Sequence, residues 1–318
     1  MTPKVYIDGH VGTTGLRIRD GLAAREDLAL LTLPEARRKD PAARRERILE
    51  ADLAVLCLPD DAAREAAAWA EEGETKLLDA STAHRVAPGW VYGLPELAPD
   101  QRKAVAGSDR VSNPGCYPTA LLLLLRPLID AGLLAADVAV AVHALSGYSG
   151  GGRPLIEKWE EPEGELLSLP FEAPYALDKV HKHVPEMMAF SGLRNPPHFV
   201  PAVGPFRCGM RVEIPLPAGT LAAGCTGKAV WETLHERYRG EAFVRVIPLA
   251  DPLGYDERSL DPRACNDTNR IDLHALPHPS GHVLLAAVLD NLGKGASGAA
   301  IQNLNLMLGC GESTGLGS

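Results

Sequence analysis

The stretch that decides the fold class is Lys4-Val-Tyr-Ile-Asp-Gly-His-Val-Gly-Thr-Thr-Gly15. A short apolar run is followed by a loop with three glycines. Apolar residues at helical spacing come next, namely Leu16, Ile18 and Leu22. The pattern predicts a strand, a glycine loop and a helix, in which the backbone N–H groups of the loop point at a bound anion. We therefore expect Gly9, Gly12 and Gly15 to bind a dinucleotide pyrophosphate. A tight turn that needs glycine only for backbone reasons is the alternative.

The alternation of strands and helices continues beyond this stretch. Apolar runs at 28–33, 53–58 and 76–79 predict three more strands, and amphipathic segments at 42–50 and 61–72 predict helices between them. Strands that are apolar on both faces and separated by helices indicate a parallel sheet covered on both sides. The N-terminal part is thus predicted to be an α/β domain with a Rossmann-type, doubly wound parallel sheet.

The pattern changes after residue 116. Long runs at 138–145, 207–216, 271–276 and 282–289 predict strands with fewer helices between them, and 296–308 has apolar residues at helical spacing. This arrangement favours an α+β domain with a mixed or antiparallel sheet. A chain of 318 residues with 46% hydrophobic residues is long enough for two domains, each with its own core.

Charge and cysteine usage argue against several classes of protein. The formal net charge of -9 lacks the attraction that binders of nucleic acids or anionic membranes use, so we expect neither partner. The six cysteines show no CxxC pair, which favours a reduced, cytoplasmic protein over a zinc ribbon or a disulfide framework. The N-terminus enters a strand directly, and Arg126 and Asp130 interrupt the strongest apolar stretch, so we expect no signal peptide and no membrane span.

Cys116 is the best candidate for a nucleophile. It lies in Ser112-Asn-Pro-Gly-Cys-Tyr-Pro-Thr119, and the apolar run from Ala120 to Leu125 predicts a buried helix directly after it. The thiol is therefore expected at a helix N-terminus, where unpaired backbone N–H groups and the helix dipole favour the thiolate. A small buried hydrophobic residue at a helix start is the structural alternative.

The segment Pro34-Glu-Ala-Arg-Arg38 bears on the choice of nicotinamide cofactor. It follows the second predicted strand, where an NAD enzyme would place an acidic group against the ribose. The guanidinium groups of Arg37 and Arg38 instead suit a 2′-phosphate, which favours NADP. A solvated charge run is the alternative interpretation of the same residues.

Two other loops carry groups that bind anions. Asp79-Ala-Ser-Thr-Ala-His-Arg85 follows the fourth predicted strand, so Ser81 and Arg85 are candidates for holding a phosphate or a carboxylate. Ser146-Gly-Tyr-Ser-Gly-Gly-Gly-Arg153 follows a strand of the second half, so its hydroxyl groups, its backbone N–H groups and Arg153 are candidates as well. A flexible connection is the alternative for the second loop.

His181-Lys-His-Val-Pro-Glu186 offers acid and base groups. Because Pro185 disfavours a helical conformation at Val184, we predict an extended segment from which His181 and His183 project on the same side, with Glu186 in the following helix. One imidazole near Cys116 can exchange a proton with the thiol, and the carboxylate can orient that imidazole. A metal site and ordinary, partly buried histidines are the alternatives, although no further ligand cluster stands out.

Taken together, these segments resemble the short form of the N-acetyl-γ-glutamyl-phosphate reductases of arginine biosynthesis, over nearly the whole chain. The resemblance rests on residues 12–16, 79–85, 92–97, 112–119, 146–153, 181–186, 268–270 and 290–298. It implies an NADP-binding domain at 1–115 that is completed by the C-terminal helix at 296–318. It also implies a catalytic and oligomerisation domain at 116–295, and a homodimer or homotetramer.

The resemblance also implies roles for particular residues. Cys116 is the nucleophile that attacks the acyl phosphate to form a thioester, NADPH delivers a hydride, and His181 or His183 donates a proton as the thiohemiacetal collapses. The remaining implied residues fall into three groups. Glu186 completes the catalytic residues as the group that orients an imidazole. Phosphate or carboxylate recognition involves Ser81, Arg85, Asn113, Ser146, Arg153 and Arg207. Cofactor binding involves Gly9, Gly12, Thr13, Thr14, Gly15, Arg37, Arg38 and Asn291, and no metal is implied.

Four alternative functions remain open. Aspartate-semialdehyde dehydrogenase and the lysine-pathway reductase of a carrier-bound aminoadipyl phosphate share the same chemistry, and the carrier-bound substrate predicts a basic rim around the pocket. A non-enzymatic NADP-binding regulator does not explain why Cys116, both histidines and Glu186 are present. A cysteine hydrolase leaves the glycine loop without a function and predicts activity without nicotinamide.

Overall fold

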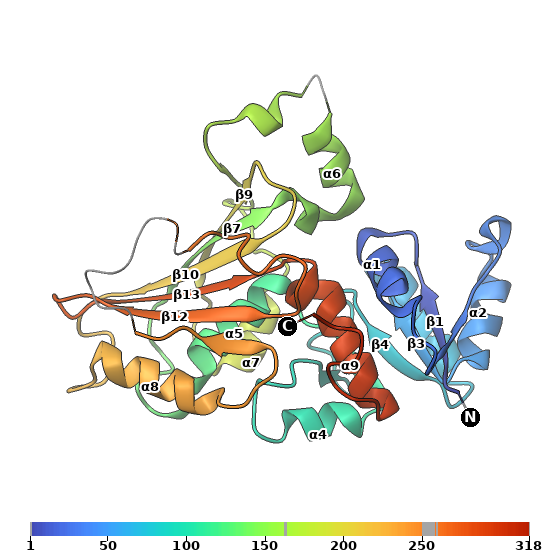
Figure 1. Ribbon diagram of the computed structural model, residues 1–318, viewed down its shortest axis with the longest axis horizontal. Helices are drawn as coiled ribbons and strands as arrows, with labels where there is room; N and C mark the ends of the chain where they lie inside the picture. Colours follow the sequence, from blue (N-terminus) through green and yellow to red (C-terminus); the bar gives the residue numbers. More distant parts are fainter. Residues whose placement is uncertain (1, 162–163, 250–257, 259, 318) are drawn as a thin grey trace. The chain divides into compact units, whose positions relative to one another are not determined.

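The computed structural model describes residues 2–161, 164–249, 258 and 260–317. Its backbone contacts divide the chain into two compact units (Figure 1). The first comprises the residues up to Pro114 together with Ala296–Gly317, and the second comprises Gly115–Gly295.

The first unit contains a six-stranded sheet in the order β2-β1-β3-β4-β6-β5, in which every neighbouring pair is parallel. Its strands are β1 (Lys4–Asp8), β2 (Ala29–Leu31), β3 (Leu53–Leu56), β4 (Lys76–Asp79), β5 (Val91–Tyr92) and β6 (Arg110–Ser112). The predicted parallel, doubly wound sheet is confirmed. The strand order reverses beside β1, and ligands of such sheets bind where the carboxyl ends of the strands meet this reversal.

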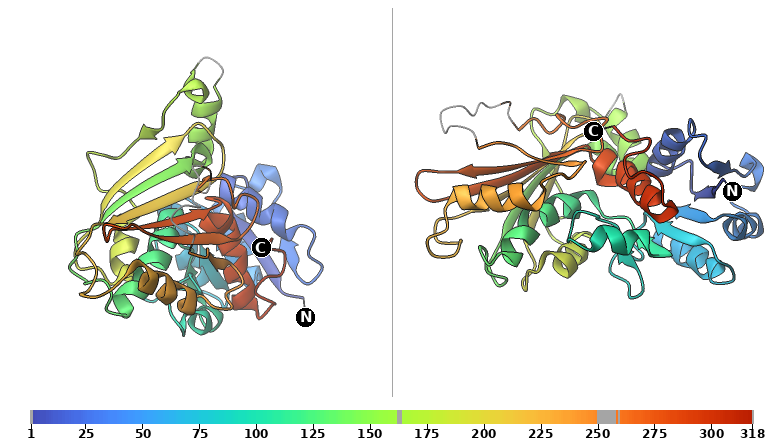
Figure 2. Two further views of the ribbon diagram at one scale, coloured as in Figure 1. Left: turned by 60° about the vertical axis from the view of Figure 1, so that its left-hand side comes forward. Right: turned by 60° about the horizontal axis from the view of Figure 1, so that its bottom comes forward.

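Helices cover both faces of this sheet, as Figures 1 and 2 show. Val5 and Ile7 pack against α1 (Thr13–Leu22) and α9 (Gly298–Leu308), whereas Tyr6 packs on the opposite face with α2 (Pro41–Glu50) and α3 (Asp60–Ala70). Successive side chains of a strand point to opposite faces, so the unbroken apolar run of β1 is buried on both sides. A short helix, α4 (Gln101–Ala106), lies against α9.

The second unit is built on a seven-stranded mixed sheet in the order β11-β12-β13-β10-β7-β9-β8. Its strands are β7 (Ala141–Gly147), β8 (Ala173–Pro174), β9 (His198–Gly204), β10 (Met210–Leu216), β11 (Val244–Val246), β12 (Ile271–Pro277) and β13 (Val283–Leu289). The pairs β7–β9 and β11–β12 are parallel and the other pairs are antiparallel, so the predicted mixed α+β domain is confirmed.

Three helices of this unit, α5 (Cys116–Asp130), α7 (Val184–Ser191) and α8 (Gly227–Arg237), pack together on the sheet. A fourth, α6 (Gly152–Glu160), follows β7 through the short helical turn Tyr148–Gly151. The helix predicted from residue 296 is α9, which begins at Gly298 after a π-helical turn at Gly293–Ser297. No helix among the described residues combines the length and the apolar character that crossing a membrane requires.

The boundaries of several strands differ from the prediction, and five strands of the described residues were not predicted, namely β5, β6, β8, β9 and β11. The strand expected at 138–145 lies at Ala141–Gly147, and the strand expected from residue 207 begins only at Met210. The longest of these is β9, whose sequence contains Pro201 and follows two further prolines. Proline inside an apolar run argues against a strand, but here the parallel pairing with β7 prevails over that local signal.

Candidate active site

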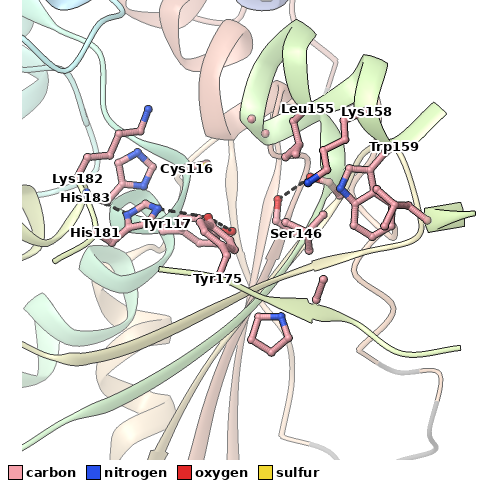
Figure 3. A pocket seen from close by; sticks show the side chains of 17 residues that line it. Cys116, Tyr117, Ser146, Leu155, Lys158, Trp159, Tyr175, His181, Lys182 and His183 are labelled. Atoms are coloured by element: carbon pink, nitrogen blue, oxygen red, sulfur yellow. Dashed lines mark hydrogen bonds between the residues drawn. The ribbon is translucent and has the colours of Figure 1, made fainter. Parts of the chain in front are cut away.

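Cys116 is the first residue of α5, as predicted. The preceding residue, Gly115, has an extended backbone (φ -76°, ψ 153°), and no described side chain caps the helix at that position. The first backbone N–H groups of a helix have no intrahelical acceptor, so they and the helix dipole favour an anion on the sulfur. Cys116 is partly exposed and lines a pocket of about 420 Å³ within the second unit (Figure 3).

Two residues from distant parts of the sequence hold the backbone around Cys116. Glu186, which is only 2% exposed, accepts a hydrogen bond from the backbone N–H of Gly115 through Oε2 at 2.9 Å. Gly295 lies so close that a Cβ atom added there would be 2.8 Å from the Cβ atom of Cys116. This hydrogen bond supports the backbone that carries the nucleophile, and the role of Glu186 at an imidazole stays a prediction. Gly295 was missed as a site residue.

His181 and His183 lie next to each other and line the same pocket as Cys116 (Figure 3). Their ring centroids are 4.9 Å apart. The predicted extended conformation from His181 to Val184 is wrong, because these residues form a turn. Val184 donates its backbone N–H to the carbonyl oxygen of His181 at 2.9 Å and begins α7, so Pro185 stands in a first helical turn, where proline is tolerated.

The hydrogen bonds of His181 define its tautomer. Its Nδ1 atom accepts the backbone N–H of His183 at 3.2 Å, so the neutral ring carries its proton on Nε2, which lies 3.3 Å from the hydroxyl oxygen of Tyr175. The Tyr175 hydroxyl group in turn donates to the Tyr117 hydroxyl oxygen at 3.2 Å. Burial, with a smaller contribution from the charge of Lys182, lowers the pKa of His181 to about 4. His181 is therefore uncharged near pH 7.

The two tyrosines extend this network under the nucleophile. Tyr117 is buried, and its ring makes edge contacts with both imidazoles and with Phe199. Burial is the main cause that raises the pKa of Tyr117, and burial also raises the pKa of Tyr175 to about 12. Both hydroxyl groups therefore keep their protons. Tyr175 was not among the predicted site residues, and its only local signal is its position six residues before His181.

The other side of the pocket is formed by β7 and α6. Ser146, at the end of β7, is buried, and Figure 3 shows it between the histidine side and the side of α6. The side chains of Leu155, Lys158 and Trp159 enter from α6. Among the described residues, the lining contains two lysines and two histidines but no Asp or Glu. The lysines, Lys158 and Lys182, were missed, although Leu155 and Lys158 have the spacing of residues on one helix face.

Arg153 and Arg207 do not line this pocket. The Arg153 side chain is 76% exposed, and its Nε atom lies 2.7 Å from the Oε1 atom of Glu157. The Arg207 side chain is 61% exposed and pairs with Glu160 at 2.9 Å. Both predicted anion-binding arginines are thus paired with carboxylates of α6, and their role in substrate recognition stays a prediction.

The three predicted anion-binding residues of the first unit make hydrogen bonds within that unit. The Ser81 hydroxyl group donates to Oδ2 of Asp79 at 2.8 Å, and Arg85 is buried with Nη2 at 3.5 Å from the carbonyl oxygen of Ala80. Asn113 donates through Nδ2 to the carbonyl oxygen of Ala296 at 2.9 Å and accepts a hydrogen bond from Asn303. These contacts shape the carboxyl edge of the sheet after β4 and β6.

The glycine loop has the geometry of a pyrophosphate site. Gly9 has a φ of +87°, and a Cβ atom there would lie 2.2 Å from the carbonyl oxygen of Cys57. A Cβ atom at Gly15 would lie 2.4 Å from the carbonyl oxygen of Gly9, so both positions require glycine. Gly12 precedes α1, whose first residues are Thr13 and Thr14, and no described side chain caps this helix. The residues therefore fit a dinucleotide phosphate at a helix N-terminus.

The other predicted cofactor residues have protein partners. Arg37 and Arg38 stand after β2, where a 2′-phosphate would lie, and pair with Asp40 at 3.1 Å and with Glu35 at 2.5 Å. These ion pairs are at the surface and are weak enough to exchange for a ligand. Asn291 belongs to the second unit, where it accepts the N–H of Gly209 and donates to the Ser149 hydroxyl oxygen. Its part in cofactor binding stays a prediction.

The described residues contain no group of three or more His, Cys, Asp or Glu side chains that could hold a metal ion. The alternative in which His181, His183 and Glu186 ligate a metal therefore has no support from this part of the chain.

Comparison with known proteins adds independent findings. The family of semialdehyde dehydrogenase NAD-binding domains matches residues 11–105, and the semialdehyde dehydrogenase dimerisation domain matches residues 116–291. N-acetyl-γ-glutamyl-phosphate reductase 2 of Pseudomonas putida is 50% identical over 315 residues, covering 99% of both chains. The reductase of Burkholderia ambifaria is 50% identical over 308 residues, covering 96% of both.

Solved structures support the fold. Aspartate semialdehyde dehydrogenase II of Vibrio cholerae aligns with a TM-score of 0.74 at 16% identity, over 97% of this chain and 99% of the other. The Candida albicans aspartate semialdehyde dehydrogenase with NADP aligns with a TM-score of 0.67 at 15% identity, over 97% and 99%. From the identity shared with the reductases over nearly the full length, the chain belongs to the N-acetyl-γ-glutamyl-phosphate reductase family of semialdehyde dehydrogenases.

Proposed function

We propose that this protein reduces N-acetyl-L-γ-glutamyl 5-phosphate to N-acetyl-L-glutamate 5-semialdehyde and phosphate, with NADPH as the reductant. The observation that carries the proposal is the pocket of the second unit, where Cys116 at the start of α5 lies with His181 and His183. The reductases that share half of its residues bear the name of this activity.

The composition of the pocket favours an N-acylated substrate over a free amino acid derivative. An aspartyl phosphate carries an ammonium group, which needs a carboxylate or several carbonyl acceptors when it is buried. The described lining offers no Asp or Glu, and instead combines two lysines and two histidines with apolar side chains. An acetylated nitrogen carries no charge and brings a methyl group, so it suits this lining better than an ammonium group does.

The chain's own groups account for the acyl transfer. The Cys116 thiolate attacks the acyl carbon, so a carbon–sulfur bond forms while the carbon–oxygen bond to phosphate breaks and phosphate leaves with the electron pair. The hydrogen bond from Gly115 to Glu186 keeps the start of α5 in place during this step. After reduction the carbon–sulfur bond breaks, the aldehyde leaves and the thiolate is restored. We assign the accompanying proton exchange to the pair of His181 and His183.

The cofactor is NADP. The loop of Gly9, Gly12 and Gly15 with the first residues of α1 would hold its pyrophosphate, and Arg37 and Arg38 would meet its 2′-phosphate. When bound, NADPH supplies the hydride that reduces the thioester. This assigns cofactor binding to residues 1–115 with 296–318, and catalysis and oligomerisation to 116–295. The matches to an NAD-binding domain at 11–105 and a dimerisation domain at 116–291 support that division.

A homodimer or homotetramer in the cytoplasm is part of the same proposal. The second unit matches a domain family named for dimerisation. All six cysteines are free thiols, which is typical of proteins from reducing compartments.

The test is a spectrophotometric assay of the reverse reaction, in which phosphate, NADP or the N-acetyl group is left out in turn. Each omission should abolish NADPH formation. Cys116→Ser should lower turnover by about a thousandfold or more while leaving NADPH binding intact. Cys225→Ser, a thiol of the second unit outside the pocket lining, is the matched control and should behave as wild type.

Each alternative function predicts a different result in this assay. Turnover without nicotinamide would identify a cysteine hydrolase, and NADPH binding without turnover would identify a regulator. Turnover of aspartate semialdehyde, or only of a carrier-bound aminoadipate semialdehyde, would assign the chain to one of the two related dehydrogenases. Any of these results would refute the proposed reaction.

A further inference from the structure

The cations around α6 differ in what surrounds them. Arg153 and Arg207 pair with Glu157 and Glu160, as described above. Lys158 stands on the same helix and lines the pocket, and no carboxylate of the described residues pairs with it. Figure 3 shows its side chain directed toward Ser146. Of Arg153, Arg207 and Lys158, it is therefore Lys158 that can bind an anion inside the pocket.

Lys158 is exposed, and apolar side chains of the pocket lining lie beside it. Leu155, Trp159 and Leu166 line the same side of the pocket, and Trp159 is held by stacking on Tyr148 at a centroid distance of 5.6 Å. An ammonium group beside an apolar wall suits a ligand in which one carbon atom carries both a carboxylate and an apolar substituent. The carboxylate pairs with the ammonium group, and the apolar substituent packs on the wall. The Lys158 side chain is exposed, so it is accessible to such a ligand.

The position of Lys158 in the pocket indicates which of the substrate's two anionic groups it can reach. Cys116, His181 and His183 gather on one side of Ser146, and Lys158 lies on the other (Figure 3). The phosphate leaves from the acyl carbon that Cys116 attacks, so it must lie on the histidine side. The α-carbon, two methylene groups further on, carries both a carboxylate and the acetylated nitrogen.

Resting on the proposed function, we propose that Lys158 binds the α-carboxylate of the substrate and determines specificity for it, while the apolar wall receives the acetyl group. Lys158 is thus a substrate-binding residue at the end of the pocket opposite the reacting carbon. It selects substrates by the carboxylate and takes no part in proton transfer.

The test compares two aldehydes in the reverse reaction. N-acetylglutamate 5-semialdehyde carries the α-carboxylate, and 4-acetamidobutanal is the same molecule without it. Lys158→Met should lower kcat/KM for the first aldehyde about 10- to 100-fold, mainly through KM, because a hydrogen bond to a charged group is lost. It should leave kcat/KM for the second aldehyde and KM for phosphate unchanged. Lys158→Arg should recover part of the loss.

Lys228→Met is the matched control, because Lys228 is an exposed helix lysine that pairs with Glu232 on α8. It should change neither aldehyde's kinetics. An equal loss for both aldehydes with Lys158→Met would mean a structural role, and a rise in KM for phosphate alone would mean a phosphate-binding role. Either result would overturn the inference while wild-type turnover upholds the proposed function. If wild type turns over neither aldehyde, the proposed function fails and the inference fails with it.

Discussion

Gly295→Ala is the substitution that tests most directly whether the position of the Cys116 sulfur limits the rate. A methyl group at Gly295 would lie 2.8 Å from the Cβ atom of Cys116 and 3.1 Å from the carbonyl oxygen of Asp290. Ordinary contacts of this kind begin at 3.4 Å, so the two carbon atoms must separate by the difference between 3.4 and 2.8 Å, or 0.6 Å. Because the carbonyl oxygen of Asp290 also lies close to the added methyl group, part of this displacement falls on Cys116.

The displacement has a predicted cost for catalysis and another for stability. A misplacement of about 1 Å in a reacting group costs roughly a hundredfold in rate, so a shift of this size should lower kcat/KM on the order of tenfold, or about 1.4 kcal/mol. Overpacking should also lower the free energy of unfolding by about 1–3 kcal/mol. The measurements are the reverse-reaction kcat/KM, the rate of Cys116 alkylation by iodoacetamide, and urea unfolding.

Gly227→Ala supplies the control, because a methyl group there would lie 2.4 Å from the Cβ atom of Pro277, and α8 does not contribute to the described pocket lining. This variant should lose comparable stability and keep wild-type kcat/KM. If Gly295→Ala retains wild-type kcat/KM, or if both variants lose activity equally, the argument from the geometry of Cys116 is refuted.

Three further outcomes are expected. Glu186→Ala should lower the unfolding free energy in urea by about 1.5–3 kcal/mol because the Gly115 N–H loses its charged acceptor, and Glu186→Gln should lose less; equal losses would contradict this. The pKa of His181 is about 4 in the folded protein and near 6.5 when unfolded, so the unfolded state binds more protons and stability falls as the pH drops from about 6.5 to about 4. His181→Gln should flatten that decline in pH-dependent urea titrations, and an unchanged slope would rule out this origin. Arg38→Ala should raise KM for NADPH about tenfold and leave KM for NADH unchanged, whereas equal changes for both would remove Arg38 from 2′-phosphate recognition.

Local signals in the sequence predict much of the first unit and the start of α5 in the second. The strand at Lys4–Asp8 and the start of α5 at Cys116 agree with the structure because backbone rules decide them within a few residues. A glycine that must adopt a positive φ, as at Gly9, leaves little choice of residue. An apolar run without polar alternation likewise indicates a strand buried on both faces.

Local rules are less decisive where one residue type serves two structures. Pro185 is compatible with an extended preceding residue and with a first helical turn, and only the packing of α7 against α5 selects the helix. Pro201 argues against a strand, yet β9 forms because β7 offers it a parallel partner. The prediction that both histidines lie near Cys116 therefore rested on an extended conformation that the chain does not adopt.

By itself, the sequence determined the strands of the parallel sheet, the glycine loop and a cysteine at a helix start, because each depends on residues that are close together in the chain. Only the tertiary structure decided what surrounds that cysteine. Glu186 reaches Gly115 across 71 residues, Gly295 closes against Cys116, and α6 turns Lys158 into the pocket while Arg153 pairs outside it. Such contacts join residues far apart in the chain, and no local pattern specifies which of two cations on one helix will face the pocket.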